Sequence, residues 1–220
     1  MSEWWTYSLS SFLLFSARTY YRLFELYNLA VWPLQIVALA LGFAIIILIW
    51  RSPVWSGRAV ATILAGCWLF VAWAYFLERY DPINWVARYF AIGFVVQAAL
   101  LMWTGIVRDR LRFDLRGIAV RIGLALIVYA LALHPLIAPL TGRSWIQAEI
   151  FGLAPDPTVI ATLGILLSAD RLRWHLLAVP LLWCAISALT LWTMESPEAP
   201  INAIVVVLVV MTALKRARMW

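Results

Sequence analysis

Six mostly apolar stretches, each about as long as a membrane is thick, constrain this chain more than any other feature. A helix needs about 20 predominantly apolar residues to cross a bilayer. The stretches are Leu29–Trp50, Arg58–Phe76, Pro82–Val107, Gly117–Leu140, Trp174–Met194 and Pro200–Leu214. The chain is 65% hydrophobic and 13% charged, whereas soluble domains are about 45–50% apolar and about 25% charged. We therefore expect an all-α fold, a polytopic membrane helix bundle.

The distribution of charge favours a seventh crossing, the shorter stretch Ala154–Ala169. If it crosses, one side of the membrane holds 12 of the 17 basic residues against three acidic ones. Cytoplasmic loops are enriched in Lys and Arg, so this side is predicted to be cytoplasmic, with the N-terminus outside and the C-terminus inside. Without the seventh crossing, Arg171, Arg173 and the basic tail would move to the outer side and blur the asymmetry. About seven transmembrane helices are expected.

Residues 1–28 differ from the remainder, residues 29–220, which we expect to form a single transmembrane domain. Ser10 or Ser11 is a candidate helix cap. On a helical wheel one side carries aromatic residues and another carries charges: Phe12, Tyr20, Phe24 and Tyr27 against Arg18, Arg22 and Glu25. An interfacial amphipathic helix is predicted, because three charges at mid-depth would be expensive. A first span or a re-entrant piece is the alternative.

The stretch His134–Gly164 is the longest interruption of the apolar sequence. Within it, Asp156 followed by Pro157 predicts a helix start, with Asp as the cap and Pro in the first turn. From Pro157 to Ala169 is about 20 Å of helix, short of the roughly 30 Å hydrocarbon core. The helix would then begin below the outer surface, where irregular backbone must be buried in protein or line a wet cavity. A tight cap in locally thinned bilayer is the alternative.

Charged residues near the second and third spans are candidates for the same region. Asp81 precedes Pro82 and is predicted to cap the third span. Arg88 lies about 10 Å into that helix, so its side chain must snorkel or pair. A pair with Glu78, Glu149 or Asp156 would close an outward-facing polar cavity.

The end of the fourth span and the loop after it supply two more candidates. His134 precedes Pro135, so it can leave helical geometry and point into that cavity, although a hydrogen-bonded structural histidine is the alternative. Residues 145–151 are predicted as a short surface helix, or as a solvated loop. On either view Glu149 should face protein or water rather than lipid. The candidate ligand-binding residues are therefore Arg88, His134, Glu149, Asp156, Glu78 and Asp81.

No enzyme signature accompanies these residues. The sequence lacks GxSxG, HExxH and Walker motifs, and its two histidines exclude a three-histidine zinc site within one chain. His134 and His175 are predicted near opposite faces, so no catalytic residue, metal ligand or cofactor is assigned. Gln97 and Asn202 are expected to form interhelical hydrogen bonds. Glu195 and Glu198 are expected to be solvated, and Cys67 and Cys184 to be small core residues.

Membrane lipid is the expected partner. A basic segment between the third and fourth spans is predicted to contact anionic lipid through Arg108, Arg110, Arg112 and Arg116. Nucleic acid is disfavoured, because no pattern of stacking aromatics accompanies these charges. The function favoured by the outer polar residues is small-solute transport or binding. The alternative is a non-catalytic subunit of a larger membrane complex or homo-oligomer, suggested by the 14 Trp residues and the amphipathic N-terminal segment.

Two segments carry a family resemblance. They are MSEWWTYSLSSFLLFSARTYYRLFELYN and QAEIFGLAPDPTVIATLG, and they are similar to a family of small multi-pass membrane proteins of bacteria, known only as domain of unknown function 6064. The resemblance extends over most of the chain and implies a protein of the bacterial inner membrane. It implies no activity, ligand or catalytic residue.

Overall fold

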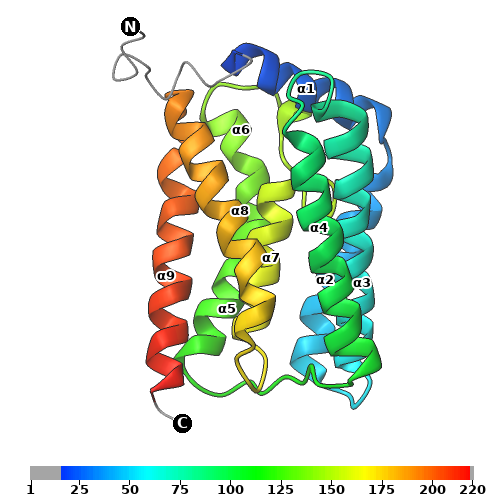
Figure 1. Cartoon of the computed structure of the whole chain (residues 1–220), viewed down its shortest axis with the longest axis vertical. Coiled ribbons are helices and arrows are strands. Elements are labelled where there is room, and N and C mark those ends of the chain that lie inside the picture. Colours follow the sequence, from blue (N-terminus) through cyan, green and yellow to red (C-terminus); the bar gives the residue numbers. More distant parts are fainter. Residues whose placement is uncertain (1–15, 219–220) are drawn as a thin grey trace, which may run out of the picture.

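The computed structural model describes residues 16–218 as a bundle of helices (Figure 1). Within that range no strand forms, apart from one isolated bridge between Phe113 and Ala169. The all-α prediction is confirmed. The elements are α1 (Ala17–Ala30), α2 (Leu34–Arg51), α3 (Ser56–Phe70) with η3 (Val71–Tyr80), α4 (Ala87–Met102) with η4 (Trp103–Val107), α5 (Ile118–Val128) with η5 (Tyr129–Leu133) and η6 (His134–Leu136), α6 (Ile137–Leu140), η7 (Trp145–Gln147), α7 (Pro155–Leu167), α8 (Trp174–Thr193) and α9 (Ala199–Ala217).

Six helical stretches of the described chain are long and apolar enough to cross a membrane. They match the six apolar stretches of the sequence, with shifted ends: Leu34–Arg51, Ser56–Tyr80, Ala87–Val107, Ile118–Leu140, Trp174–Thr193 and Ala199–Ala217. The largest shifts are at the starts of α2 and α4, which each begin five residues later than predicted. The predicted cap at Asp81 is wrong, because α4 begins at Ala87 and the Val86 N–H donates to the side chain of Asn84 (3.1 Å).

The bundle has two chemically different ends. We call "the basic end" the one that carries the α2–α3 turn, the segment 108–117, the turn 168–173 and the end of α9. The other is "the α1 end" (Figure 1). The Asp170 N–H donates to the Arg112 carbonyl (2.7 Å), which joins two basic segments far apart in sequence. The charge argument had grouped Arg171 and Arg173 with the segment 108–116, and the structure confirms that grouping.

Helix α7 is short and lies inside the bundle (Figure 1). All 13 of its residues are buried, so neighbouring helices rather than lipid surround it. Gly164 of α7 and Gly123 of α5 bring the two backbones into contact: a Cβ on either glycine would lie within 2.5 Å of the other's carbonyl oxygen. The prediction of a short helix is confirmed, with the bounds Pro155–Leu167, and α7 is an internal helix in addition to the six long ones of the described chain. Its start below the outer membrane surface stays a prediction.

Helix α1 lies across one end of the bundle (Figure 1). Its cap is Ser16, whose side chain accepts from the Thr19 N–H (3.2 Å); the predicted caps Ser10 and Ser11, and also Phe12, lie outside the described residues. Its buried face includes Tyr20, Phe24 and Tyr27, and its exposed face includes Arg18 and Arg22. The amphipathic pattern of this segment is confirmed.

Candidate functional site

A group of ionisable side chains is buried at the α1 end, on elements that sequence separates widely. We call it the polar cluster: the buried residues His134, Glu149, Asp156 and Glu198, together with Arg143, which is partly buried. It combines three of the six predicted ligand-binding residues with two residues that were not predicted to belong to it. Buried ionisable groups are costly in an apolar bundle, so their convergence makes the polar cluster the candidate functional site.

Asp156 forms the deepest part of the cluster and is 2% exposed. Its carboxylate accepts from Trp183 Nε1, Ser187 Oγ and Asn202 Nδ2, each at 2.7 Å. These donors tie the first turn of α7 to α8 and α9. The predicted capping role is wrong, because the cap position is Ala154 and helix α7 begins at Pro155. The prediction that Asn202 bonds between helices is confirmed.

His134 and Glu149 form the middle of the cluster and are 6% and 5% exposed. Their atoms Nε2 and Oε2 lie 3.7 Å apart, and Tyr129 Oη lies 3.3 Å from His134 Nδ1. Within the described residues Glu149 Oε2 receives no hydrogen bond. A buried carboxylate oxygen with no donor has room in its chemistry for a proton or for a cationic ligand.

Arg143 and Glu198 form the part of the cluster nearest the surface. They make an ion pair, and the Arg143 guanidinium also stacks 4.0 Å from the centre of the Tyr21 ring. The prediction that Glu198 is solvated is wrong, because the turn between α8 and α9 folds under α1. Burial, reinforced by the charge of Glu149, raises the pKa of Glu198 to about 7 despite the opposing effect of Arg143.

Helix α1 closes the cluster from above. Tyr27 Oη donates to the Leu153 carbonyl (3.0 Å), and Asn28 Nδ2 donates to the carbonyls of Ile146 (2.6 Å) and Ala148 (2.8 Å). These bonds hold the loop before α7 against α1. The segment is a single 3₁₀ turn (Trp145–Gln147) followed by extended chain, so the predicted helix over residues 145–151 is wrong.

The other three predicted residues do not reach the cluster. Arg88 pairs with Asp81 (Nε to Oδ1, 2.7 Å), its side chain is 70% exposed, and Glu78 is exposed as well. The predicted pairing of Arg88 with Glu78, Glu149 or Asp156 is therefore wrong: Arg88 does pair, but with Asp81, and it lies at the second residue of α4 rather than about 10 Å into the helix. The hydrogen bond from Arg88 lowers the pKa of Asp81.

The sequence contained only a weak signal for Arg143 and Glu198. They are 55 residues apart and each lies in a short polar turn, a pattern typical of solvated loops. A surface pocket of about 540 Å³ does open at the α1 end, lined by Arg18, Thr19, Arg22, Glu25 and Gln147. None of the six predicted residues lines it. Hydrogen bonds from Arg22 and Gln147 lower the pKa of Glu25.

Comparison with known families matches residues 17–219 to a family of unknown function, DUF6064. The chain belongs to this family. The expected family is thereby confirmed over residues 17–219, which include the segment that ends at Gly164 and only the last part of the opening segment. No curated protein and no solved structure matches the chain.

The polar cluster contains more acidic than basic side chains, and this imbalance limits what it can bind. It holds three carboxyl groups against one guanidinium and one imidazole, so full ionisation would leave net negative charge inside an apolar bundle. Such a charge is neutralised by bound protons or by a cation. Among residues 16–218 no three His, Cys, Asp or Glu side chains are arranged to hold a metal ion. The arrangement is therefore suited to exchanging protons or to binding a small organic cation.

Proposed function

We propose that this DUF6064 protein binds or transports a small solute in a proton-linked manner at the polar cluster. The observation that carries the proposal is the excess of buried carboxyl groups around Glu149, whose Oε2 atom has no donor among the described residues. A proton on His134 or Glu149, 3.7 Å apart, changes the local charge by one unit. Loading a cationic solute would then be linked to proton release.

The position of α7 supports the same proposal. Transporter sites are commonly built where short helices end inside the membrane, because backbone and side-chain polar groups become available there. The start of α7 at Pro155 is such a place, and Asp156 and Thr158 are buried polar residues of its first turn. Thr158 Oγ1 accepts from the Gly152 N–H (2.8 Å), so the irregular chain before the helix is held by side chains of the helix itself.

Many tryptophans near the ends of the helices are exposed, and they fit a bilayer interface. Exposed examples are Trp32, Trp50, Trp55, Trp85, Trp103, Trp145, Trp174 and Trp192. These eight of the 14 tryptophans fit two aromatic belts. The placement we propose is the bacterial cytoplasmic membrane, with the basic end in the cytoplasm and the α1 end outside.

A topology experiment tests this placement. Reporter fusions at residues 112 and 145 are expected on opposite sides of the membrane, with 112 cytoplasmic, because segment 108–117 and α6 lie at opposite ends of the bundle (Figure 1). An alkaline phosphatase and green fluorescent protein pair gives the readout. Finding both positions on one side would contradict the bundle topology, and finding 112 outside would reverse the orientation.

A proton-flux measurement tests the function. The purified protein is reconstituted into liposomes that contain a pH-sensitive dye and a quaternary ammonium ion as the solute, and dilution into solute-free buffer lets the exit of the solute drive the entry of protons. We expect wild-type liposomes to acidify faster than empty ones, and the Glu149→Gln variant to lose about 90% of this excess rate, because the amide cannot exchange a proton.

The matched control is Asp81→Asn, which removes a partly exposed carboxylate at the same end of the bundle. It should keep the wild-type rate, since Asp81 contacts Arg88 outside the polar cluster. A proton-flux rate for Glu149→Gln equal to that of wild type would show that the transported protons do not pass through the polar cluster. A wild-type rate equal to that of empty liposomes would contradict proton-linked transport, and binding would then be tested by thermal shifts with small amines.

A further inference from the structure

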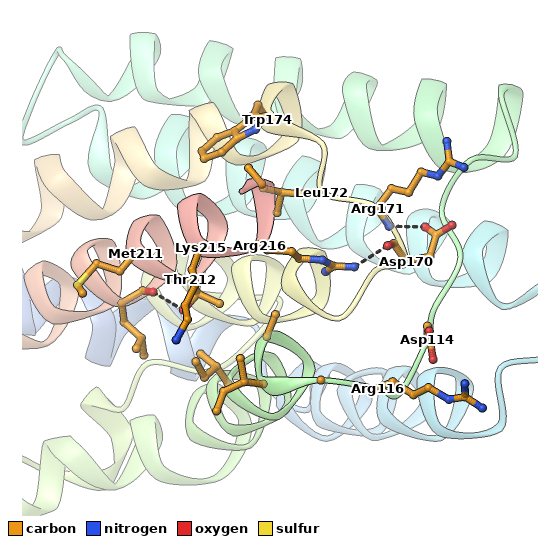
Figure 2. Close-up of a pocket in the computed structure, with 16 residues that line it drawn as sticks. Asp114, Arg116, Asp170, Arg171, Leu172, Trp174, Met211, Thr212, Lys215 and Arg216 are labelled. Carbon is orange, nitrogen blue, oxygen red and sulfur yellow. Dashed lines mark hydrogen bonds between the residues drawn. The ribbon is translucent and has the colours of Figure 1, made fainter. Parts of the chain in front are cut away.

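A cavity of about 960 Å³ opens at the basic end, far from the polar cluster. It lies between the start of α5, the end of α9 and the turn that precedes α8 (Figure 2). Its volume falls in the range of about 300–1,000 Å³ typical of small-molecule sites. Nothing in the proposed function uses it.

The walls of this cavity are apolar. Ile118 and Ile122 come from α5, Leu208 and Met211 from α9, and Trp174 from the start of α8. Ile118 and Met211 are more than half exposed. Exposed apolar side chains that line a cavity at the end of apolar helices favour contact with lipid or with an apolar ligand, because burial removes their surface from water.

The mouth of the cavity is basic. It is lined by Arg116, Arg171, Lys215 and Arg216, with Asp114 and Asp170 as the acidic residues (Figure 2). Four positive and two negative side chains leave a net charge of +2. A phosphate or another anion at this mouth would be attracted by that charge.

Two charged residues of the mouth, Arg216 and Asp170, already contact other parts of the protein. The remaining basic side chains can therefore bind a ligand. Arg216 donates to the carbonyls of Leu167 (3.0 Å) and Asp170, so it holds the end of α9 against the end of α7. The Asp170 carboxylate is paired with Arg173 (3.5 Å), which is not part of the lining. Among the described residues, the side chains of Arg116, Arg171 and Lys215 form no ion pair.

We propose that this cavity is a binding site for an anionic phospholipid. One acyl chain lies along the wall formed by α5 and α9, and the phosphate is held at the mouth by Arg116 and Lys215. A soluble phosphate compound would leave the apolar wall exposed, and a neutral lipid would leave the basic mouth without a counter-charge. Basic pockets between membrane helices are a known chemical solution for binding anionic head groups.

This site differs from general surface attraction to the basic segment. Arg112 is paired with Asp109 (3.3 Å), and the Arg108 guanidinium lies 4.9 Å from the centre of the Trp103 ring. Neither lines the cavity. Of the four residues expected to contact anionic lipid, Arg116 alone lines it. The pair Arg108 and Arg112 therefore provides a control with the same charge at the same end.

The test is native mass spectrometry of the full chain in detergent, titrated separately with phosphatidylglycerol and phosphatidylcholine. We expect wild type to bind one phosphatidylglycerol at least fivefold more tightly than phosphatidylcholine. Each basic residue near a membrane surface contributes a factor of about 5, so Arg116→Gln with Lys215→Gln should weaken phosphatidylglycerol binding about 25-fold. Arg108→Gln with Arg112→Gln should change it less than threefold. Thermal unfolding of both variants checks that they remain folded.

Several outcomes would overturn the proposal. If both double variants lose the same affinity for phosphatidylglycerol, the lipid is bound by general surface attraction. If wild type binds both lipids equally well, the charge of the head group does not contribute to binding. Displacement of the lipid by 10 mM inorganic phosphate would indicate a soluble anion site instead. A lipid-free dimer that is lost in the Arg116→Gln, Lys215→Gln variant would show that a second copy covers the cavity. A phosphatidylglycerol with a photoactivatable acyl chain should label peptides of α5 and α9, and labelling elsewhere would contradict the acyl-chain placement.

Discussion

Replacing Asp156 by Ala is expected to lower the free energy of unfolding by about 2–5 kcal/mol, because several buried hydrogen-bond donors lose their acceptor. The substitution leaves the donors of Trp183, Ser187 and Asn202 without their acceptor in a buried site. An unsatisfied buried donor costs about 1–3 kcal/mol. Part of the loss is recovered by the Asn202–Ser187 hydrogen bond (3.0 Å), which survives the substitution. The measurement is SDS-induced unfolding from mild detergent, followed by circular dichroism.

The matched control is Asp81→Ala, which removes the same side chain from an exposed pair. Its unfolding midpoint should equal that of wild type, because exposed ion pairs contribute little. The variant Asp156→Asn adds a second comparison: it keeps the shape but turns one acceptor into an NH₂ donor that faces other donors, so it should fall between wild type and Asp156→Ala. A midpoint for Asp156→Ala within error of wild type would show that this carboxyl group does not hold α7 to α8 and α9.

The sequence predicts which apolar residues are buried away from water and which polar residues are kept away from lipid. It does not predict which side chains the polar residues contact. The membrane helices follow from apolar length alone, and the 13-residue length of α7 follows from its flanking polar residues. The role of Asp156 was missed because Asp before Pro is also the ordinary signal for a helix cap. The structure begins α7 at Pro155, two residues before the predicted start at Pro157, which frees the Asp156 carboxylate to reach α8 and α9.

The errors at Arg88 and Glu198 have a common cause. Both depend on how a short turn folds, and hydrophobic periodicity says little about turns. The α4 helix starts at Ala87 rather than Pro82, so Asp81 lies in a turn from which it can reach Arg88 directly. Glu198 lies in a polar turn that resembles a solvated loop, yet the loop before α7 and helix α1 cover it. Which surfaces cover a turn depends on the packing of distant elements.

Replacing Gly164 by Ala is expected to destabilise the bundle by about 1–3 kcal/mol, the cost of overpacking. The added Cβ would lie 2.5 Å from the Gly123 carbonyl oxygen and 3.0 Å from side-chain atoms of Leu126 and Ile127. The first of these is a backbone atom, which cannot turn aside as a side chain can, so α5 and α7 must separate. Thermal unfolding in detergent measures the loss.

The matched controls are Gly66→Ala in α3 and Gly93→Ala in α4. A Cβ at either position meets nothing within 4 Å, so these variants should be neutral or more stable by about 0.5–1 kcal/mol, since Gly is unfavourable inside a helix. Asp156 lies on the same helix as Gly164, about two turns away. A displaced α7 should therefore also reduce proton flux at the polar cluster, while the two controls keep it. Gly164→Ala with wild-type stability and flux would show that the contact between α5 and α7 does not position the cluster.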